Sequence, residues 1–237
     1  LPFGKMLLLA ILAGAYIALA GVGATAAAVT VESGSLAKLL SACVFPAGLS
    51  MVILAGSELF TGNCLMVMAL LERRITPAQL LRNWLTVYLG NAMGGAAVAA
   101  LAVYSHTASL FGDGLARSMV SIAESKAALG AGDAFLRGVL CNFLVCLAVW
   151  MAAASKRAEG KVIALFFPIL LFVLCGYEHC IANLYYLPAG AFAAAEYGME
   201  TTLTLAGCLK NLAAVTLGNL VGGAALGVGY RFAYLKE

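Results

Sequence analysis

The feature that constrains this chain most is a polar phrase that interrupts two long apolar runs in the same way. The first run extends from Leu36 to Leu71 and the second from Val162 to Pro188. Each run contains a glycine, a glutamate and an asparagine, and the second set follows the first by 120 positions. These residues are Gly56, Glu58 and Asn63, and then Gly176, Glu178 and Asn183. Because charged groups at membrane depth are costly, they are usually kept for function.

A soluble domain of this size has too little interior for so apolar a chain. Of its 237 residues, 63% are hydrophobic and only 11% are charged. The apolar runs are long enough to cross a bilayer as helices, and they lack the two-residue alternation of membrane β-strands. We therefore predict an all-α membrane protein, a single transmembrane channel domain over residues 1–237, with the lipid bilayer as a partner and no nucleic acid.

We expect six transmembrane helices. Their approximate ranges are Lys5 to Ala28, Leu36 to Leu71, Leu80 to Tyr104, Ala134 to Ala154, Val162 to Ala194, and Thr201 to Phe232. The second and fifth are predicted to be broken into half-helices, over Gly56–Asn63 and Gly176–Asn183. Non-helical backbone at this depth is tolerated only where it is buried in protein or lines a cavity. The stretch from Ser105 to Asp133 is mixed in composition and carries no predicted span.

A second repeated phrase indicates an internal duplication. Leu89-Gly90-Asn91-Ala92-Met93-Gly94-Gly95 matches Leu217-Gly218-Asn219-Leu220-Val221-Gly222-Gly223, 128 positions later. We predict one repeat over about 1–105 and another over about 131–237. Because each has three spans, the second enters the membrane from the opposite side. Paired interruptions in an inverted 3+3 repeat point to a permeation site near the midplane.

The basic residues predict an orientation. With the N-terminus in the cytoplasm, nine of the 14 lysines and arginines fall on the inner side. Basic residues accumulate on the cytoplasmic side of membrane proteins. We therefore predict that the N- and C-termini are both cytoplasmic.

The two breaks predict a path for an anion. The N-termini of half-helices favour negative charge, and Thr61 and His179 add a hydroxyl and an imidazole. Large apolar side chains near the breaks are predicted to form constrictions: Phe45, Leu49, Leu59, Phe60 and Phe172. Four polar residues are predicted to structure the loops, with the two carboxylates accepting hydrogen bonds from the freed amides: Glu58, Asn63, Glu178 and Asn183.

Four phrases together resemble the formate/nitrite transporter family. They are Gly56-Ser57-Glu58-Leu59-Phe60-Thr61-Gly62, Leu140-Cys141-Asn142-Phe143-Leu144-Val145-Cys146-Leu147-Ala148-Val149-Trp150-Met151, Gly176-Tyr177-Glu178-His179-Cys180-Ile181-Ala182-Asn183 and Val215-Thr216-Leu217-Gly218-Asn219. The resemblance implies an aquaporin-like fold, a homopentamer with one pore per protomer, and passage of formate, nitrite or hydrosulfide. It implies that the pore histidine is His179 and the loop threonine Thr61. It also places Lys126 as a lysine that draws anions in from outside, and Asn142 as the asparagine of the fourth helix.

The chain departs from the family pattern at two positions. Cys180 stands where serine is common, and Lys210 stands where a polar residue or histidine is expected. The phrases around His179 and in the fourth helix resemble the nitrite branch of the family, which implies nitrite or hydrosulfide rather than formate. Whether His179 stabilises the anion or lends it a proton stays open at this point.

The sequence thus predicts a passive channel for small monovalent anions in a bacterial inner membrane. The alternative is an aquaporin-like channel for neutral solutes, although the paired Asn-Pro-Ala turns of that class are absent. We expect no enzyme activity, cofactor or metal. Cys180 beside His179 is the only nucleophile–base candidate, and sequence neighbours on a helix are poorly placed to react together.

Overall fold

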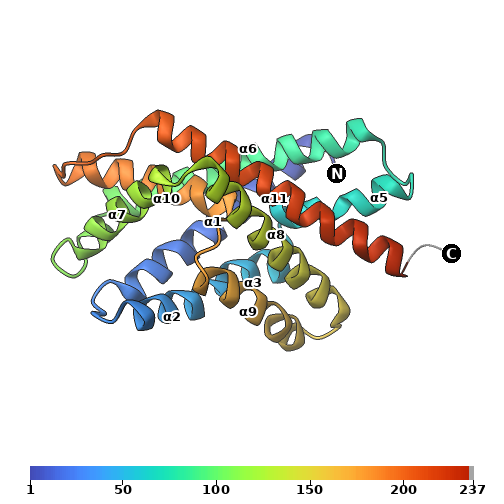
Figure 1. Cartoon of the computed structure of the whole chain (residues 1–237), viewed down its shortest axis with the longest axis horizontal. Coiled ribbons are helices and arrows are strands. Elements are labelled where there is room, and N and C mark those ends of the chain that lie inside the picture. The colour runs from blue at the N-terminus through green and yellow to red at the C-terminus, as the bar shows by residue number, and fades with distance from the viewer. Residues whose placement is uncertain (235–237) are drawn as a thin grey trace.

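The computed structural model describes residues 1–234, and within them every regular element is helical (Figure 1). The first half contains α1 (Phe3–Ala28), α2 (Gly34–Val44), α3 (Pro46–Ala55), α4 (Phe60–Asn63), the 3₁₀ turn η1 (Cys64–Met66), α5 (Val67–Leu71) and α6 (Pro77–Tyr104). A linking region holds η2 (Thr107–Ser109) and α7 (Gly114–Ala128). The second half contains α8 (Ala131–Ala154), α9 (Ala158–Leu174), α10 (Cys180–Glu196) and α11 (Leu205–Tyr234).

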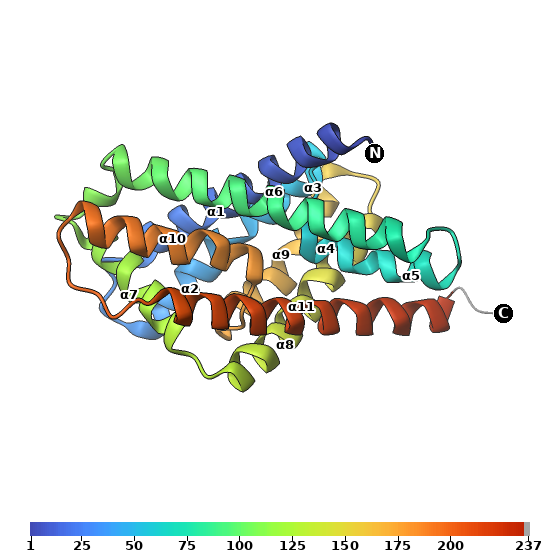
Figure 2. The same ribbon diagram turned by 90° about the horizontal axis from the view of Figure 1, so that it is seen from above.

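The two halves repeat one arrangement, which is the predicted 3+3 inverted repeat. The outer helices of each half, α1 with α6 and α8 with α11, pack along their lengths. Glycines allow this approach: a side chain at Gly94 would collide with the Ile11 carbonyl, and one at Gly222 with the Val139 carbonyl. Small residues at such positions let membrane helices pack closely. In Figure 2, α6, α10 and α11 run side by side along the long axis of the molecule.

Each broken span stops at a glycine in the left-handed conformation. Gly56 ends α3 at φ 77°, and Gly176 follows α9 at φ 69°. The next backbone N–H in each loop donates a hydrogen bond back to the preceding helix. Ser57 donates to the Val52 carbonyl and Tyr177 to the Phe172 carbonyl. Glycine adopts this conformation without the steric cost that a β-carbon brings. The repeated glycine of the sequence is therefore the stop signal of each first half-helix.

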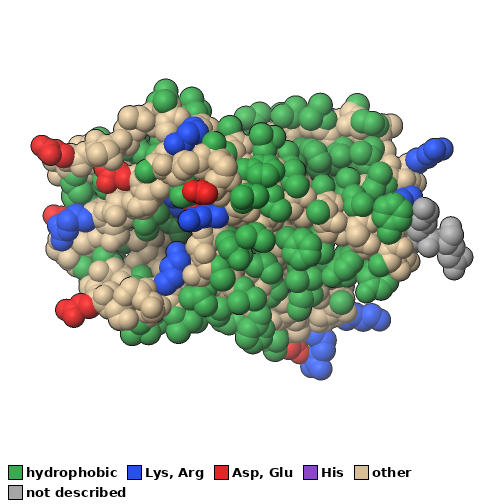
Figure 3. Space-filling view, in the orientation of Figure 1, with side chains coloured by type: hydrophobic (Ala, Val, Ile, Leu, Met, Phe, Trp, Pro, Cys, Tyr) green, Lys and Arg blue, Asp and Glu red, His purple; other side chains and the backbone are tan. Residues whose placement is uncertain are grey.

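Within residues 1–234, five helices are long and apolar enough to cross a membrane, if α2 and α3 are taken together. The sixth span is divided between α9 and α10, which have 17 residues each. Hydrophobic side chains cover the middle of the face in Figure 3, and charged ones gather toward its two ends. The start of α1 and the end of α11 lie toward the same end of the molecule (Figures 1 and 2).

Two predicted features are corrected. The stretch from Ser105 to Asp133 contains a helix, α7, which was not predicted. Both breaks are shorter than predicted, because the helices resume at Phe60 and Cys180. Asn63 and Asn183 therefore lie in the first turns of the resumed helices rather than in the loops.

The α7 helix is tied to the loop before α11. The Glu124 carboxylate accepts the backbone N–H of Thr202 at 2.6 Å and the Thr201 hydroxyl at 2.9 Å. These bonds hold the pKa of the Glu124 carboxyl below its usual range, because they favour its charged form. This contact holds α7 against the end of the bundle where the cavity described next opens.

Candidate functional site

Three cavities follow one another between the two broken spans. We name the larger two by the predicted orientation. The outer vestibule lies beside α7 and has a volume of about 400 Å³. The inner vestibule has a volume of about 280 Å³, and a gap of only about 10 Å³ lies between them. Because the gap shares lining residues with both vestibules, the three form one interrupted path through the protein.

Four of the five predicted constriction residues line this gap. Phe45 and Phe172 are shared with the outer vestibule, and their rings meet edge to face at 5.7 Å. Leu49 and Leu59 are shared with the inner vestibule. An apolar gap of this size excludes hydrated ions.

The fifth predicted constriction residue, Phe60, lies elsewhere. Its ring packs against Tyr88 at 5.0 Å and Trp84 at 6.4 Å, both on α6. It is not among the residues that line the described cavities. Leu59 is the last residue before α4 and Phe60 the first residue within it, so their side chains diverge. We therefore withdraw Phe60 from the predicted constrictions.

His179 lies in the gap, and both of its ring nitrogens are bonded. It caps α10, and its Nδ1 accepts the Ala182 backbone N–H at 3.1 Å. Because an acceptor nitrogen carries no proton, the neutral ring holds its proton on Nε2. That nitrogen lies 3.0 Å from the Thr61 hydroxyl, to which it donates. The predicted pair from the two breaks is thus in direct contact, while the ring of Phe172 stacks on the imidazole at 5.7 Å.

Asn142 lies behind this pair rather than in the path. It is fully buried, and its side-chain amide donates to the carbonyls of Asn219 at 2.7 Å and Thr61 at 3.3 Å. The Cys146 thiol donates to the same Thr61 carbonyl at 3.2 Å. Asn142 therefore positions Thr61 through its backbone.

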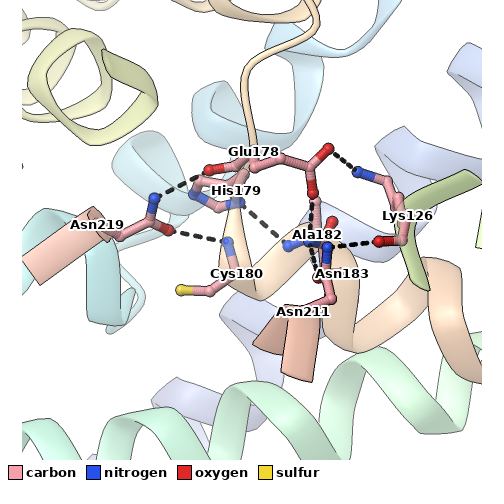
Figure 4. Close-up of polar contacts among 8 residues, drawn as sticks. All are labelled: Lys126, Glu178, His179, Cys180, Ala182, Asn183, Asn211 and Asn219. Atoms are coloured by element: carbon pink, nitrogen blue, oxygen red, sulfur yellow. Dashed lines mark hydrogen bonds and ion pairs between the residues drawn. The ribbon is translucent and has the colours of Figure 1, made fainter. Parts of the chain in front are cut away.

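Two asparagines that were not predicted to have a site role hold the breaks in place. We call Asn91 and Asn219 the break asparagines. Asn91 Oδ1 accepts the Phe60 N–H at 3.0 Å. Asn219 Oδ1 accepts the Cys180 N–H at 2.8 Å, as Figure 4 shows. Each also donates to two carbonyls: Asn91 to Ala10 and Glu58, and Asn219 to Gly138 and Glu178. They satisfy backbone groups that the breaks would otherwise leave without partners.

The repeated spacing within the sequence is a signal that could have pointed to these residues. Asn91 and Asn219 occupy equivalent places in the second repeated phrase, 128 positions apart. A polar residue repeated inside two apolar helices is the signal that could have identified them, because buried amides are retained where they satisfy partners.

The four residues predicted to structure the loops form two glutamate–asparagine pairs, but the carboxylates do not cap the freed amides. Asn63 Nδ2 donates to Glu58 Oε2 and Asn183 Nδ2 to Glu178 Oε2, both at 2.7 Å. The backbone amides of the two glutamates instead donate to the carbonyls of neighbouring helices, at Leu9 and Arg137. The prediction that these carboxylates accept the freed amides was therefore wrong. The carboxylates bind side chains, and the break asparagines bind the amides.

Lys126 breaks the symmetry of the two halves. It lies in the last turn of α7, not in a loop, and its Nζ binds Glu178 Oε1 at 2.9 Å (Figure 4). Its side chain is 15% exposed and that of Glu178 is 6% exposed. Its backbone carbonyl accepts the side-chain amide of Asn211 at 2.8 Å. The lysine that the resemblance implied would draw anions in from outside is thus an ion-paired group at the floor of the outer vestibule.

The comparisons with known proteins decide the family. A protein-family model described as "Formate/nitrite transporter" matches residues 1–233 of this chain. The chain belongs to the formate/nitrite transporter family. It is 39% identical to the probable formate transporter of Methanothermobacter thermautotrophicus, over 100% of this chain and 91% of that protein. It is also 39% identical to the formate channel FocA of Haemophilus influenzae, over 93% of this chain and 83% of that protein.

Solved structures of this family share the fold. A structure described as a pentameric formate channel with formate bound matches with a TM-score of 0.87 and 32% identity, over 99% of this chain and 98% of that one. An ion channel of the same family matches with the same TM-score and 32% identity, over 97% of this chain and 90% of that one. This formate/nitrite transporter family member therefore has the aquaporin-like fold and is a multi-pass membrane protein.

The ion pair at the vestibule floor makes a testable prediction. We expect Lys126→Met to lower the free energy of unfolding by about 2–4 kcal/mol, because it leaves the Glu178 carboxylate buried without its cation. The double variant Lys126→Met/Glu178→Gln removes both charges and should recover most of the loss. Thermal unfolding of the detergent-solubilised protein measures both. A single variant as stable as the wild type would show that the pair contributes nothing to the fold.

Proposed function

We propose that this chain is a passive channel for small monovalent anions of the formate, nitrite and hydrosulfide class. The observation that carries the proposal is the bonded pair of Thr61 and His179 at an apolar gap between two vestibules. An apolar gap alone would oppose any charge. A polar donor at that point offsets part of the cost for an anion that has shed its water.

The donor that we propose is the end of a hydrogen-bonded chain. The Ala182 N–H at the start of α10 donates to His179, and His179 Nε2–H donates to the Thr61 oxygen. The Thr61 hydroxyl then keeps its own proton for the anion. Bonds in such a chain polarise one another, and the first donor lies at the positive end of a helix dipole. This chain of hydrogen bonds thereby extends the positive electrostatic potential at the start of α10 to the gap.

In this arrangement His179 acts as a neutral group. Protonation of Nδ1 would set two donors against each other, because the Ala182 N–H already points at that nitrogen. Loss of the Nε2 proton would leave an imidazolate in apolar surroundings. We therefore favour stabilisation of the anion over proton donation by His179, which were the two options left open by the sequence.

Formate is the first anion to test. The formate channel FocA and the probable formate transporter are named for it, and both are 39% identical to this chain. The preference for nitrite or hydrosulfide over formate stays a prediction from the phrases around His179. All three anions are small enough to accept a hydrogen bond from one hydroxyl.

The assembly and its location are part of the proposal. A homopentamer is supported by the 99% coverage of this chain by a structure described as pentameric. A bacterial inner membrane, with both termini in the cytoplasm, is supported by the distribution of basic residues. The relatives named above are transporters and channels, which supports a transport role without enzyme activity.

Flux into proteoliposomes tests the function. We expect the wild type to pass at least one of formate, nitrite and hydrosulfide, and His179→Phe to change the selectivity or rate because it removes the middle of the donor chain. The flux divided by the concentration of the ionised anion should stay constant across about pH 5–8, where a free histidine titrates. Flux that rises as the pH falls, beyond the change in anion concentration, would instead indicate proton coupling through His179.

The neutral-solute alternative has its own readout in the same vesicles. Liposomes that swell in glycerol but pass none of the three anions would favour it and would overturn the proposed function. An unchanged rate, selectivity and pH profile in His179→Phe would remove His179 from the path while leaving the channel function in place.

A further inference from the structure

The outer vestibule is lined by two more basic than acidic side chains. Lys38, Lys126, Arg137 and Glu178 line it, and Lys126 is already paired with Glu178 at 2.9 Å. Within the part of the chain that the structure describes, the side chains of Lys38 and Arg137 have neither an ion pair nor a hydrogen bond. Figure 3 shows basic side chains gathered at a hollow in the left half of the face, with an acidic one among them.

These charges lie close enough to act together. Lys38 interacts electrostatically with Lys126, Arg137 and Glu178. The three cations and one carboxylate leave the lining with an excess of two positive charges. Arg137 presents a planar guanidinium suited to bidentate binding of a carboxylate, while Lys38 supplies a second, compact cation.

A small monovalent anion matches this vestibule in neither charge nor size. Formate has one charge and three heavy atoms, so it neutralises one of the two spare cations. The cavity volume of about 400 Å³ leaves room for a much larger molecule. Serine hydroxyls on the walls, at Ser121 and Ser125, add hydrogen-bonding groups for its other oxygens.

We propose that the outer vestibule binds a small organic dicarboxylate, with one carboxylate on Arg137 and the other on Lys38. The bound dianion is too large for the gap of about 10 Å³ behind Phe45 and Phe172, and its second charge has no donor there. It therefore occupies the mouth without passing and blocks monovalent anions from the outer side. The binding step stands by itself, while the block rests on the proposed channel function.

Calorimetric titration of the detergent-solubilised protein tests the binding step. Malonate and succinate serve as dianions and propionate as the monovalent comparator. We expect the better dicarboxylate to bind at least about tenfold more tightly than propionate, and Arg137→Gln and Lys38→Gln each to weaken it by about tenfold, the equivalent of one charged hydrogen bond. Lys210→Gln is the matched control, because it removes the same charge from exposed α11 outside the vestibule.

Formate flux tests the block. In right-side-out membrane vesicles the dicarboxylate should slow formate entry, and Arg137→Gln should raise the half-blocking concentration by about tenfold, whereas Lys210→Gln should not. Dicarboxylate binding no tighter than that of propionate, or affinity and block unchanged in both Arg137→Gln and Lys38→Gln, would overturn the proposal. A wild type that binds succinate but passes no monovalent anion would overturn the channel function and leave the vestibule site intact.

Discussion

Asn219→Leu is expected to lower the free energy of unfolding by roughly 3–6 kcal/mol. Leucine has the same branched arrangement of four side-chain heavy atoms as asparagine, so the change leaves no cavity. It removes three hydrogen bonds, from the Cys180 amide and to the carbonyls of Gly138 and Glu178, at 2.8, 2.8 and 2.9 Å. Each buried backbone group left without a partner costs about 1–3 kcal/mol. Thermal unfolding in detergent, together with the yield of folded protein, measures the loss.

The repeat supplies an internal comparison for this prediction. Asn91→Leu should cost a similar amount, because Asn91 makes the same three kinds of bond at the other break. Leu217→Ala is the control, since Leu217 lies two residues from Asn219 but is 58% exposed on the outside of α11. Asn219→Leu melting as the wild type does would contradict the role of the break asparagines.

The repeated spacing explains why so much of the fold was predictable. Glycine, glutamate and asparagine recur at one spacing in both apolar runs because each break needs the same stop signal and the same side-chain clasp. An inverted repeat also forces equivalent polar residues to meet near the centre. Tyr88 and Thr216, which are 128 positions apart, illustrate this by bonding one another at 3.0 Å.

The features that the sequence did not predict depend on the direction in which side chains point rather than on residue type. Leu59 and Phe60 are neighbours in sequence, yet only Leu59 reaches the gap, because a helix begins between them. The α7 helix was not predicted because its sequence mixes charged and apolar residues. It therefore lacks the continuous apolar run that indicates a membrane-spanning helix. The role of His179 was undecidable from sequence, since it depends on which nitrogen accepts the Ala182 amide.

Thr61→Val is expected to lower anion flux by about 10- to 100-fold while leaving the fold intact. Valine has nearly the shape of threonine but lacks the hydroxyl that ends the donor chain. A hydrogen bond to a charged group contributes about 1.5–3 kcal/mol, and each 1.4 kcal/mol is a factor of ten. Thr61→Ser keeps the hydroxyl and should keep most of the flux. Proteoliposome flux gives the rates, and thermal unfolding checks that the variants are folded.

A double variant separates a donor chain from two independent contacts. If Ala182, His179 and Thr61 act as one chain, the loss of either side chain already removes the donor that faces the anion. Thr61→Val/His179→Phe should then be little worse than the more damaging single variant, since groups that act as a unit are not additive. Losses that multiply in the double variant would mean that His179 and Thr61 contact the anion separately. The anion would in that case meet the imidazole directly, and the Nε2–H that now binds Thr61 would have to turn into the path.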